Sequence, residues 1–339
     1  MSHDTRGTGA ASTPSTPSTE ERGALVVIAG TTASGKTELA LQLARALDGE
    51  LVGADSVQVY RGFDVGSAKP TPDELGGVRH HLIDVIDPDE AIDAARFAAL
   101  ADRAIAEIVA RGKRAIVVGG TGLWLRALVR GLVVLPTPDP EVRAALEREV
   151  ERDGAPRLHA RLESLDPRAA AAIHPNDALR IVRALEVHAQ TGRPLGELRY
   201  EHGLGAPRYR TLFVSLDRER EALRARIEAR VDAMLARGWV AEVEALLARW
   251  PADARAFGSV GYREIVAHLR EGVELATTRT SIVRSTWVYT RRQRTWFRSE
   301  PGIDLHLDAA ALDVAALVER AARHLEDPSA GGASRGEGA

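Results

Sequence analysis

Residues 30–37 of the chain read Gly30-Thr31-Thr32-Ala33-Ser34-Gly35-Lys36-Thr37. This stretch satisfies the P-loop pattern G-x-x-x-x-G-K-[ST] at every fixed position. An apolar run over residues 24–29 predicts a buried strand before it, and residues 36–47 predict a helix after it. In that context, backbone N–H groups and a helix N-terminus converge on a phosphate. Lys36 would add a positive charge, and Thr37 could ligate Mg²⁺.

Apolar runs further along the chain predict more strands, at residues 51–54, 82–86, 115–118 and 212–216. Helical patterns, over residues 94–111 among others, alternate with them. Strands that alternate with helices form parallel sheets that are covered on both faces. We therefore predict an α/β fold, with a parallel sheet like that of the P-loop NTPases flanked by helices.

The pattern changes at Leu135-Pro136-Thr137-Pro138-Asp139-Pro140. From there to about Gly192 the sequence shows helical patterns and no strand, and long helices are predicted again over residues 218–249 and 276–298. We therefore expect a core of residues 23–138 and 200–325, with helices in its C-terminal part, and a helical insertion domain at residues 139–199. Residues 1–22 and 326–339 are expected to be disordered tails because of their composition.

Composition excludes several classes of protein. The 339 residues contain no cysteine, which excludes disulfides, thiolate zinc sites, iron–sulfur clusters and cysteine nucleophiles. No apolar run approaches the roughly 20 residues that span a bilayer, and the N-terminus lacks the apolar core of a secretory signal. We expect a cytoplasmic monomer without a membrane partner. Because the formal net charge is −3, any surface that binds nucleic acid must be local.

Asp55 follows the predicted strand at residues 51–54, at the carboxyl edge where open α/β sheets bind ligands. Its carboxylate could accept a proton from an attacking nucleophile or help to hold Mg²⁺. It could equally serve as a turn residue or a helix cap. Residues 55–70 mix hydroxyl, amide, aromatic and basic side chains without a helical or strand period, and such loops commonly bind a ligand.

A basic and aromatic segment lies at residues 279–298, which contain six arginines, two tryptophans, a tyrosine and a phenylalanine but no acidic residue. This combination suits RNA, because arginine pairs with phosphate and aromatic rings stack on unpaired bases. An amphipathic helix with buried aromatic residues and solvated arginines gives the same pattern. In the predicted insertion, Arg180 and Arg183 share a helix face. They could bind a backbone phosphate or pair with Asp177 and Glu186.

Taken in order, these motifs resemble the tRNA dimethylallyltransferase family over about residues 24–300. Besides the P-loop, the matching segments are Asp55-Ser56, Tyr60-Arg61-Gly62, Gly66-Ser67-Ala68-Lys69-Pro70, His80-His81-Leu82-Ile83-Asp84, Val118-Gly119-Gly120-Thr121-Gly122-Leu123, Ile173-His174-Pro175-Asn176-Asp177, Arg183-Ala184-Leu185-Glu186-Val187, Val260-Gly261-Tyr262 and Arg291-Arg292-Gln293-Arg294-Thr295-Trp296. Singly most of these are weak signals, but together they are specific. Trp124 stands where the family more often has tyrosine, and no C-terminal zinc finger is present, which points to a bacterial form.

The resemblance implies a role for each matched position. The P-loop would hold dimethylallyl diphosphate, with Lys36 and Arg226 on the diphosphate and Thr37 on Mg²⁺. Asp55 would be the general base for the exocyclic amine of the adenosine next to the anticodon, in tRNAs that read codons beginning with U. The residues implied to contact the tRNA anticodon stem-loop are Asp55, Ser56, Val57, Gln58, Thr121, Arg143, Leu179, Arg180, Ile181, Val182, Arg183, Ser259, Val260, Gly261, Tyr262, Arg263, Arg291, Arg292, Gln293, Arg294, Thr295, Trp296, Phe297 and Arg298.

Three alternatives share parts of this pattern. A P-loop small-molecule kinase would bind ATP, the usual ligand of the loop, and would also have a carboxylate after the second strand, but it has no need of the arginine-rich helix. A prenyltransferase that acts on free adenine nucleotides would not need the helical insertion. A noncatalytic RNA-binding module would leave the complete P-loop and Asp55 unexplained.

Overall fold

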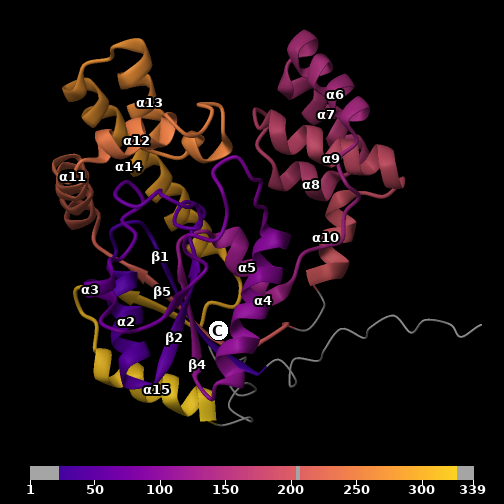
Figure 1. The fold of residues 1–339 in the computed structure, drawn as a ribbon. Helices are drawn as coiled ribbons and strands as arrows, with labels where there is room; N and C mark the ends of the chain where they lie inside the picture. The colour runs from indigo at the N-terminus through magenta and orange to yellow at the C-terminus, as the bar shows by residue number, and fades with distance from the viewer. Residues whose placement is uncertain (1–22, 204–206, 327–339) are drawn as a thin grey trace, which may run out of the picture. The chain divides into compact units, whose positions relative to one another are not determined.

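The computed structural model describes residues 23–203 and 207–326, and its centre is a parallel sheet of six strands (Figure 1). The strands are β1 (Ala24–Gly30), β2 (Gly49–Ala54), β3 (His80–His81), β4 (Arg114–Gly119), β5 (Arg210–Asp217) and β6 (Leu305–Asp308). Their order across the sheet is β3-β2-β4-β1-β5-β6, and every pair is parallel. The α/β fold predicted from the alternation of strands and helices is therefore confirmed.

The chain forms two compact units. The first contains the described residues up to Ile92, Leu100–Gly122 and those from Arg208 onward, and the second contains Asp93–Ala99 and Leu123–Pro207. Helix α4 (Ala94–Ala110) runs from the second unit into the first. The predicted insertion, residues 139–199, falls inside the second unit, which begins earlier in the chain.

The helices of the first unit pack in part against the sheet and in part against one another. They are α2 (Lys36–Ala46), α3 (Pro72–Leu75), α11 (Arg220–Ala236), α12 (Trp239–Leu247), the 3₁₀ helix η1 (Arg255–Gly258), α13 (Tyr262–Glu271), α14 (Leu275–Ser299) and α15 (Val314–Glu326). Leu39 and Leu43 of α2 and Leu317 of α15 share one apolar cluster with Val26 and Ile116 of the sheet. Burial of this cluster stabilises the packing of α2 and α15 on the sheet. The loops of the site follow the carboxyl ends of the same strands.

The second unit is helical, as the sequence pattern predicts for residues 135–192. It contains α5 (Gly122–Arg130), which begins at the boundary, and α6 (Pro140–Asp153), α7 (Ala155–Leu165), α8 (Pro167–Ala172), α9 (Ala178–Thr191) and α10 (Leu195–Gly203). Leu146, Leu158, Leu162 and Ile181 form its apolar core. Asp177 caps α9 by accepting a hydrogen bond from the Arg180 N–H at 3.2 Å.

Two predicted elements were wrong in their extent. Residues 82–86 do not form a strand, because Leu82 and Asp84 have positive φ angles of 61° and 55°, which extended backbone does not allow. The helix predicted over residues 218–249 is divided into α11 and α12 at Gly238, whose φ is 92°. Strand β6 and helix α15 were not predicted. Within the described residues, no helix has the length and apolarity to cross a bilayer.

We predict that His80 makes the fold sensitive to acid. Both ring nitrogens of this β3 residue are buried and lack a hydrogen-bond partner among the described residues, and burial, followed by the nearby charge of His81, lowers its pKa to about 4. Between pH 6.5 and 4 the unfolded chain therefore binds a proton that the folded chain does not. The free energy of unfolding should fall across that window, by an amount on the order of 3 kcal/mol.

Denaturant titrations between pH 7 and 4 measure this dependence. The variant His80→Leu, which does not titrate there, should show a shallower fall than the wild-type protein. Equal falls in the two proteins would contradict the prediction.

Candidate active site

The P-loop follows β1 and has the conformation that its glycines require. Gly35 has a φ of 102°, in the region that favours glycine. A side chain at Gly30 would place its Cβ atom 2.3 Å from the Leu216 carbonyl oxygen, so only glycine allows β1 and β5 to approach here. The loop is tied to α11, because Arg226 Nε donates to the Ala33 carbonyl at 3.0 Å.

Two hydroxyl groups of the P-loop are buried without a hydrogen-bond partner among the described residues. They belong to Thr31 and Ser34. Buried hydroxyls usually find a partner. These two lie in a loop whose N–H groups precede the N-terminus of α2, a combination that favours an anion. The loop is therefore prepared for a phosphate group.

Positive charge gathers beside the P-loop. Burial lowers the pKa of Lys36 to about 8, and the nearby carboxylate of Asp55 opposes that change. Lys36 Nζ donates to the Thr31 carbonyl at 3.3 Å. Burial also lowers the pKa of Arg230, again against the carboxylate of Asp55. The negative charge of a diphosphate would stabilise the protonated forms of Lys36 and Arg230.

Asp55 directly follows β2 and is held by its own turn. Its Oδ1 accepts hydrogen bonds from the N–H groups of Val57 at 2.9 Å and Gln58 at 3.3 Å. Oδ2 accepts no hydrogen bond from the described residues. One oxygen therefore fixes the orientation of the carboxylate, and the other is available to accept a proton from a ligand.

Thr121 lies beside Asp55 because β2 and β4 are neighbours and both end at the same edge. The Thr121 N–H donates to the Ala54 carbonyl at 3.2 Å, and its Oγ1 accepts from the Ser56 N–H at 3.1 Å. Tyr289 of α14 hydrogen-bonds to the side chains of Thr121 and Gln293, and its burial together with Asp55 raises its pKa to about 12. The phenol therefore stays protonated near neutral pH.

Gln293 connects α14 to the strand edge. Its Oε1 accepts from the Thr32 N–H at 2.8 Å, and its Nε2 donates to the Gly120 carbonyl at 2.9 Å. The side chain is buried. Sequence reasoning placed Gln293 among the RNA contacts, whereas in this structure it positions the P-loop and the turn after β4.

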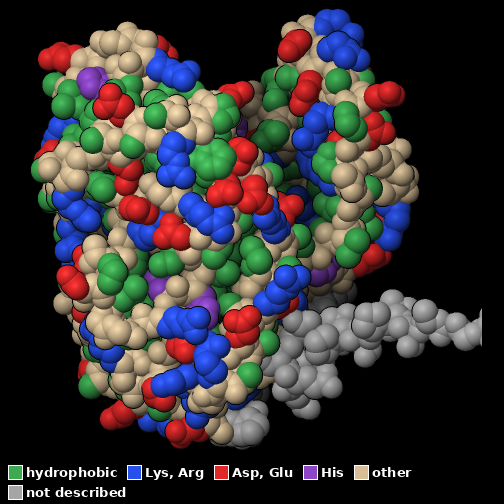
Figure 2. All heavy atoms as spheres, in the orientation of Figure 1, with side chains coloured by type: hydrophobic (Ala, Val, Ile, Leu, Met, Phe, Trp, Pro, Cys, Tyr) green, Lys and Arg blue, Asp and Glu red, His purple; other side chains and the backbone are tan. Residues whose placement is uncertain are grey.

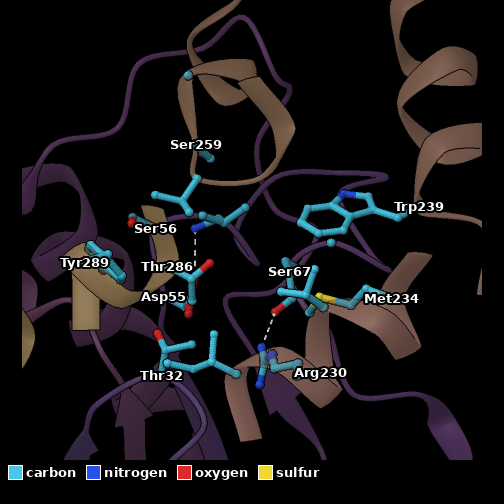
Figure 3. A pocket seen from close by; sticks show the side chains of 16 residues that line it. Thr32, Asp55, Ser56, Ser67, Arg230, Met234, Trp239, Ser259, Thr286 and Tyr289 are labelled. Atoms are coloured by element: carbon cyan, nitrogen blue, oxygen red, sulfur yellow. Dashed lines mark hydrogen bonds between the residues drawn. The ribbon is translucent and has the colours of Figure 1, made fainter. Parts of the chain in front are cut away.

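A cavity of about 260 Å³ opens between these groups (Figure 3). Its lining residues come from the P-loop, the turn after β2, and helices α11, α12 and α14. They are Thr32, Asp55, Ser56, Val57, Gly66, Ser67, Ile227, Arg230, Val231, Met234, Trp239, Gly258, Ser259, Val260, Thr286 and Tyr289. Predicted residues from distant parts of the sequence thus share one cavity.

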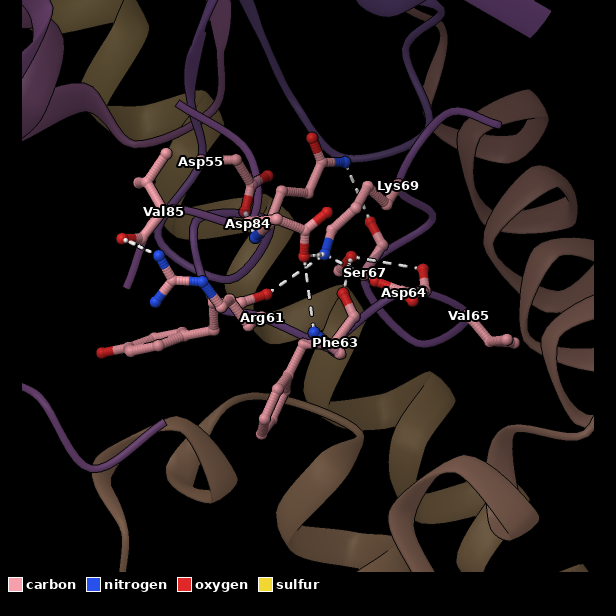
Figure 4. A network of polar contacts seen from close by, with 12 residues as sticks. Asp55, Arg61, Phe63, Asp64, Val65, Ser67, Lys69, Asp84 and Val85 are labelled. Carbon is pink, nitrogen blue, oxygen red and sulfur yellow. Dashed lines mark hydrogen bonds and ion pairs between the residues drawn. The ribbon is translucent and has the colours of Figure 1, made fainter. Parts of the chain in front are cut away.

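The loop at residues 60–70, which helps to line the cavity, is fixed by a buried lysine (Figure 4). Lys69 Nζ donates to Asp84 at 2.5 Å, to Asp64 at 2.6 Å and to the Tyr60 carbonyl at 3.1 Å. Gln58 Nε2 donates to the Ser67 carbonyl at 3.1 Å. These contacts satisfy a charge that would be costly to bury alone, so the loop has a defined shape without regular secondary structure.

The residues predicted to contact tRNA have different environments. Thr121, Arg143, Arg183, Arg294 and Trp296 are half-buried. The exposed ones are Leu179, Arg180, Arg263, Arg291, Arg292, Thr295 and Arg298. The buried ones are Ile181, Val182, Gly261, Tyr262, Gln293 and Phe297. On α14, Gln293 and Phe297 are four residues apart on the inward face, which leaves Arg291 and Arg298 to face solvent.

Within the second unit, Arg143 and Arg183 share one acidic partner. Glu186 is fully buried and accepts hydrogen bonds from Arg183 at 2.6 Å and from Arg143 at 3.0 Å. These two arginine side chains are only partly exposed. The ion pairs were one of the two roles considered for Arg183, and they hold both guanidinium groups in fixed positions.

Sequence reasoning did not identify Arg230 or Trp239, and it considered Tyr289 only as an aromatic residue of the segment at residues 279–298. Arg230 lies four residues after Arg226 and therefore on the same face of α11, a signal that could have identified it. Tyr289 stands in the arginine-rich helix but does not belong to the motifs. Trp239 reaches the cavity only through the turn at Gly238, which the prediction of one continuous helix concealed.

Comparison with known proteins gives a consistent result. The family model described as IPP transferase matches residues 58–300. A tRNA dimethylallyltransferase of Anaeromyxobacter dehalogenans (strain 2CP-C) is 52% identical over 279 residues, covering 82% of this chain and 93% of the relative. One from Sorangium cellulosum (strain So ce56) is 48% identical over 294 residues, covering 86% and 94%.

Solved structures that are similar to this chain belong to the same kind of enzyme. The tRNA isopentenylpyrophosphate transferase of Bacillus halodurans is 37% identical, with a TM-score of 0.66, and the match covers 89% of this chain and 96% of that one. A eukaryotic dimethylallyltransferase acting on tRNA is 29% identical, with a TM-score of 0.71, covering 85% and 74%.

We predict that binding of inorganic pyrophosphate depends on the charge of Lys36. In the protein without ligand, the Lys36 ammonium group loses its proton above pH 8. A bound diphosphate favours the protonated form of Lys36. Affinity should therefore fall as the pH rises from 8 to 9.5, by up to about tenfold per pH unit. Calorimetric titration measures the dissociation constant.

The variant Lys36→Arg is the control, because arginine stays protonated over this range. It also removes the effect of pyrophosphate's own titration from the comparison. Identical pH profiles in the wild-type protein and in this variant would contradict the assignment.

Proposed function

This chain belongs to the IPP transferase family of tRNA dimethylallyltransferases, and on that premise we propose the reaction that its cavity performs. A dimethylallyl group passes from dimethylallyl diphosphate to the exocyclic amine of the adenosine next to the anticodon, in tRNAs that read codons beginning with U. The supporting observation is the cavity itself, because one small space is lined by the P-loop, by a carboxylate with a free oxygen and by apolar side chains.

The P-loop side of the cavity suits the leaving group. As the bond between the allylic carbon and the diphosphate oxygen breaks, negative charge accumulates on the diphosphate. Lys36, Arg226 and Arg230 stabilise that charge together with the P-loop amides, because fixed cations and dipoles already surround the position where it develops. The allyl cation shares its positive charge over two carbons, which lowers the cost of the departure.

Mg²⁺ is the proposed cofactor, and the residues present fit it. No cluster of three or more His, Cys, Asp or Glu side chains that could hold a metal occurs in residues 23–203 and 207–326. This matches the habit of Mg²⁺, which takes one or two protein oxygens and completes its shell with substrate phosphates and water. Thr37, at the start of α2, would provide the hydroxyl ligand. When bound, the ion would offset charge on the diphosphate.

Asp55 serves the acceptor. An adenine exocyclic amine is a weak nucleophile because its lone pair is delocalised into the ring. As the new N–C bond forms, the nitrogen becomes acidic, and Oδ2 of Asp55 takes its proton. The hydrogen bonds to Oδ1 keep the carboxylate oriented during the transfer.

RNA recognition must be local because the formal net charge is −3, and on the face drawn in Figure 2 acidic and basic side chains are interspersed. The exposed arginines Arg291 and Arg298 of α14 and Arg180 of α9 are proposed contacts for backbone phosphates. The target base has to leave its stack to reach Asp55, which costs least in a loop whose bases are unpaired. We propose a monomer, because one chain supplies every side chain that this chemistry uses, and we retain the expectation of a cytoplasmic location.

We predict that Asp55→Asn lowers the rate of transfer to tRNA by about 10²–10⁴-fold. The amide oxygen can still accept the N–H groups of Val57 and Gln58, so the turn and the affinity for tRNA should be preserved. Single-turnover transfer of labelled dimethylallyl diphosphate measures the rate, and filter binding measures the affinity.

Asp73→Asn is the matched control, because it makes the same change of charge on the exposed helix α3 and should transfer at the wild-type rate. Near-normal transfer by Asp55→Asn with unchanged tRNA affinity would remove the general-base role.

A further inference from the structure

Polar and apolar side chains both line the cavity, and we call the part at Met234 and Trp239 its apolar end (Figure 3). Thr32, Asp55 and Arg230 carry the polar groups. Met234 and Trp239 lie together on the opposite side of the view from Tyr289, and both are buried, with exposed fractions of 6% and 1%. An allylic donor anchored at the P-loop by its diphosphate would extend its hydrocarbon chain toward this apolar end.

Trp239 is held so that it cannot move aside. A Cβ atom added to Gly66 would lie 1.9 Å from Trp239 Nε1, and one added to Gly261 would lie 2.1 Å from its Cη2. The indole therefore contacts the backbone at both glycines. Its ring also packs edge-on against Tyr262, with centroids 5.5 Å apart and an interplanar angle of 76°.

The surroundings of Trp239 are themselves tied down by Glu242. This α12 carboxylate accepts hydrogen bonds from the N–H groups of Val65 at 2.6 Å and Gly66 at 3.2 Å, and from the Tyr262 hydroxyl at 2.8 Å. The loop on one side of the indole and the aromatic ring on another are thus fixed to the helix that carries Trp239. The indole N–H is buried and has no partner in the described parts of the chain, and its nitrogen lies against the backbone at Gly66.

We propose that Trp239, with Met234, limits the donor to a single isoprene unit. The inference rests on the proposed function and adds the residues that would set the length of the donor's hydrocarbon chain. A cavity of about 260 Å³ lies below the roughly 300–1,000 Å³ of most small-molecule sites. On this proposal the indole closes the end of the cavity where a second isoprene unit would have to fit, and its displacement would require movement of the backbone at Gly66 and Gly261.

The test compares kcat/KM for dimethylallyl and geranyl diphosphate with the same unmodified tRNA. The variants are Trp239→Leu and Met234→Ala, which enlarge the apolar end. Leu246→Ala is the matched control, because Leu246 lies on the same helix as Trp239 with 5% exposure but does not line the cavity. If Trp239→Leu does not fold, Trp239→Phe, which keeps an aromatic ring against Tyr262, replaces it.

The wild-type protein should prefer the dimethylallyl donor by at least about tenfold. The ratio of geranyl to dimethylallyl kcat/KM should rise by about tenfold or more in Trp239→Leu and Met234→Ala and stay at the wild-type value in Leu246→Ala. A wild-type protein that uses both donors equally, or cavity variants with the ratio of the control, would overturn this inference alone. If the wild-type protein transfers no dimethylallyl group to tRNA, the proposed function fails and this inference fails with it.

Discussion

The parallel pairing of β2, β4, β1 and β5 is the constraint on which the site depends. Because these strands point the same way, the P-loop after β1, Asp55 after β2 and Thr121 after β4 emerge at one edge of the sheet. The P-loop and the Asp55 carboxylate therefore lie close together. Helix α14 then closes the edge, and Gln293 joins it to the P-loop and to Gly120 through two hydrogen bonds.

The charges in the cavity follow from that convergence. Lys36 and Arg230 are partly withdrawn from water, which lowers the pKa of each, and Asp55 is the carboxylate that opposes both changes. An anion that enters this site would favour the protonated forms of Lys36 and Arg230. In the proposed reaction, the donor's diphosphate and the general base would therefore share one cluster of charges.

The predictable parts of the molecule were those encoded locally. The P-loop, the position of Asp55 and the helical character of residues 135–192 follow from short patterns. The prediction of a strand at residues 82–86 was wrong because Leu82 and Asp84 have positive φ angles. The pattern of apolar residues does not reveal such angles. Arg230, Tyr289 and Trp239 stand outside the matched motifs, and C-terminal helices bring them to the cavity from about 200 residues away in the sequence. Contacts of that range depend on tertiary packing.

The central claim is that this cavity joins a prenyl diphosphate to an adenine presented by tRNA. The most direct measurement mixes the purified protein with Mg²⁺, labelled dimethylallyl diphosphate and either unmodified tRNA, whose anticodon ends in A and is followed by adenosine, or AMP. The account predicts label in the tRNA, at the adenosine next to the anticodon, and none in AMP. Label in AMP at a comparable rate, or no label in tRNA, would contradict it.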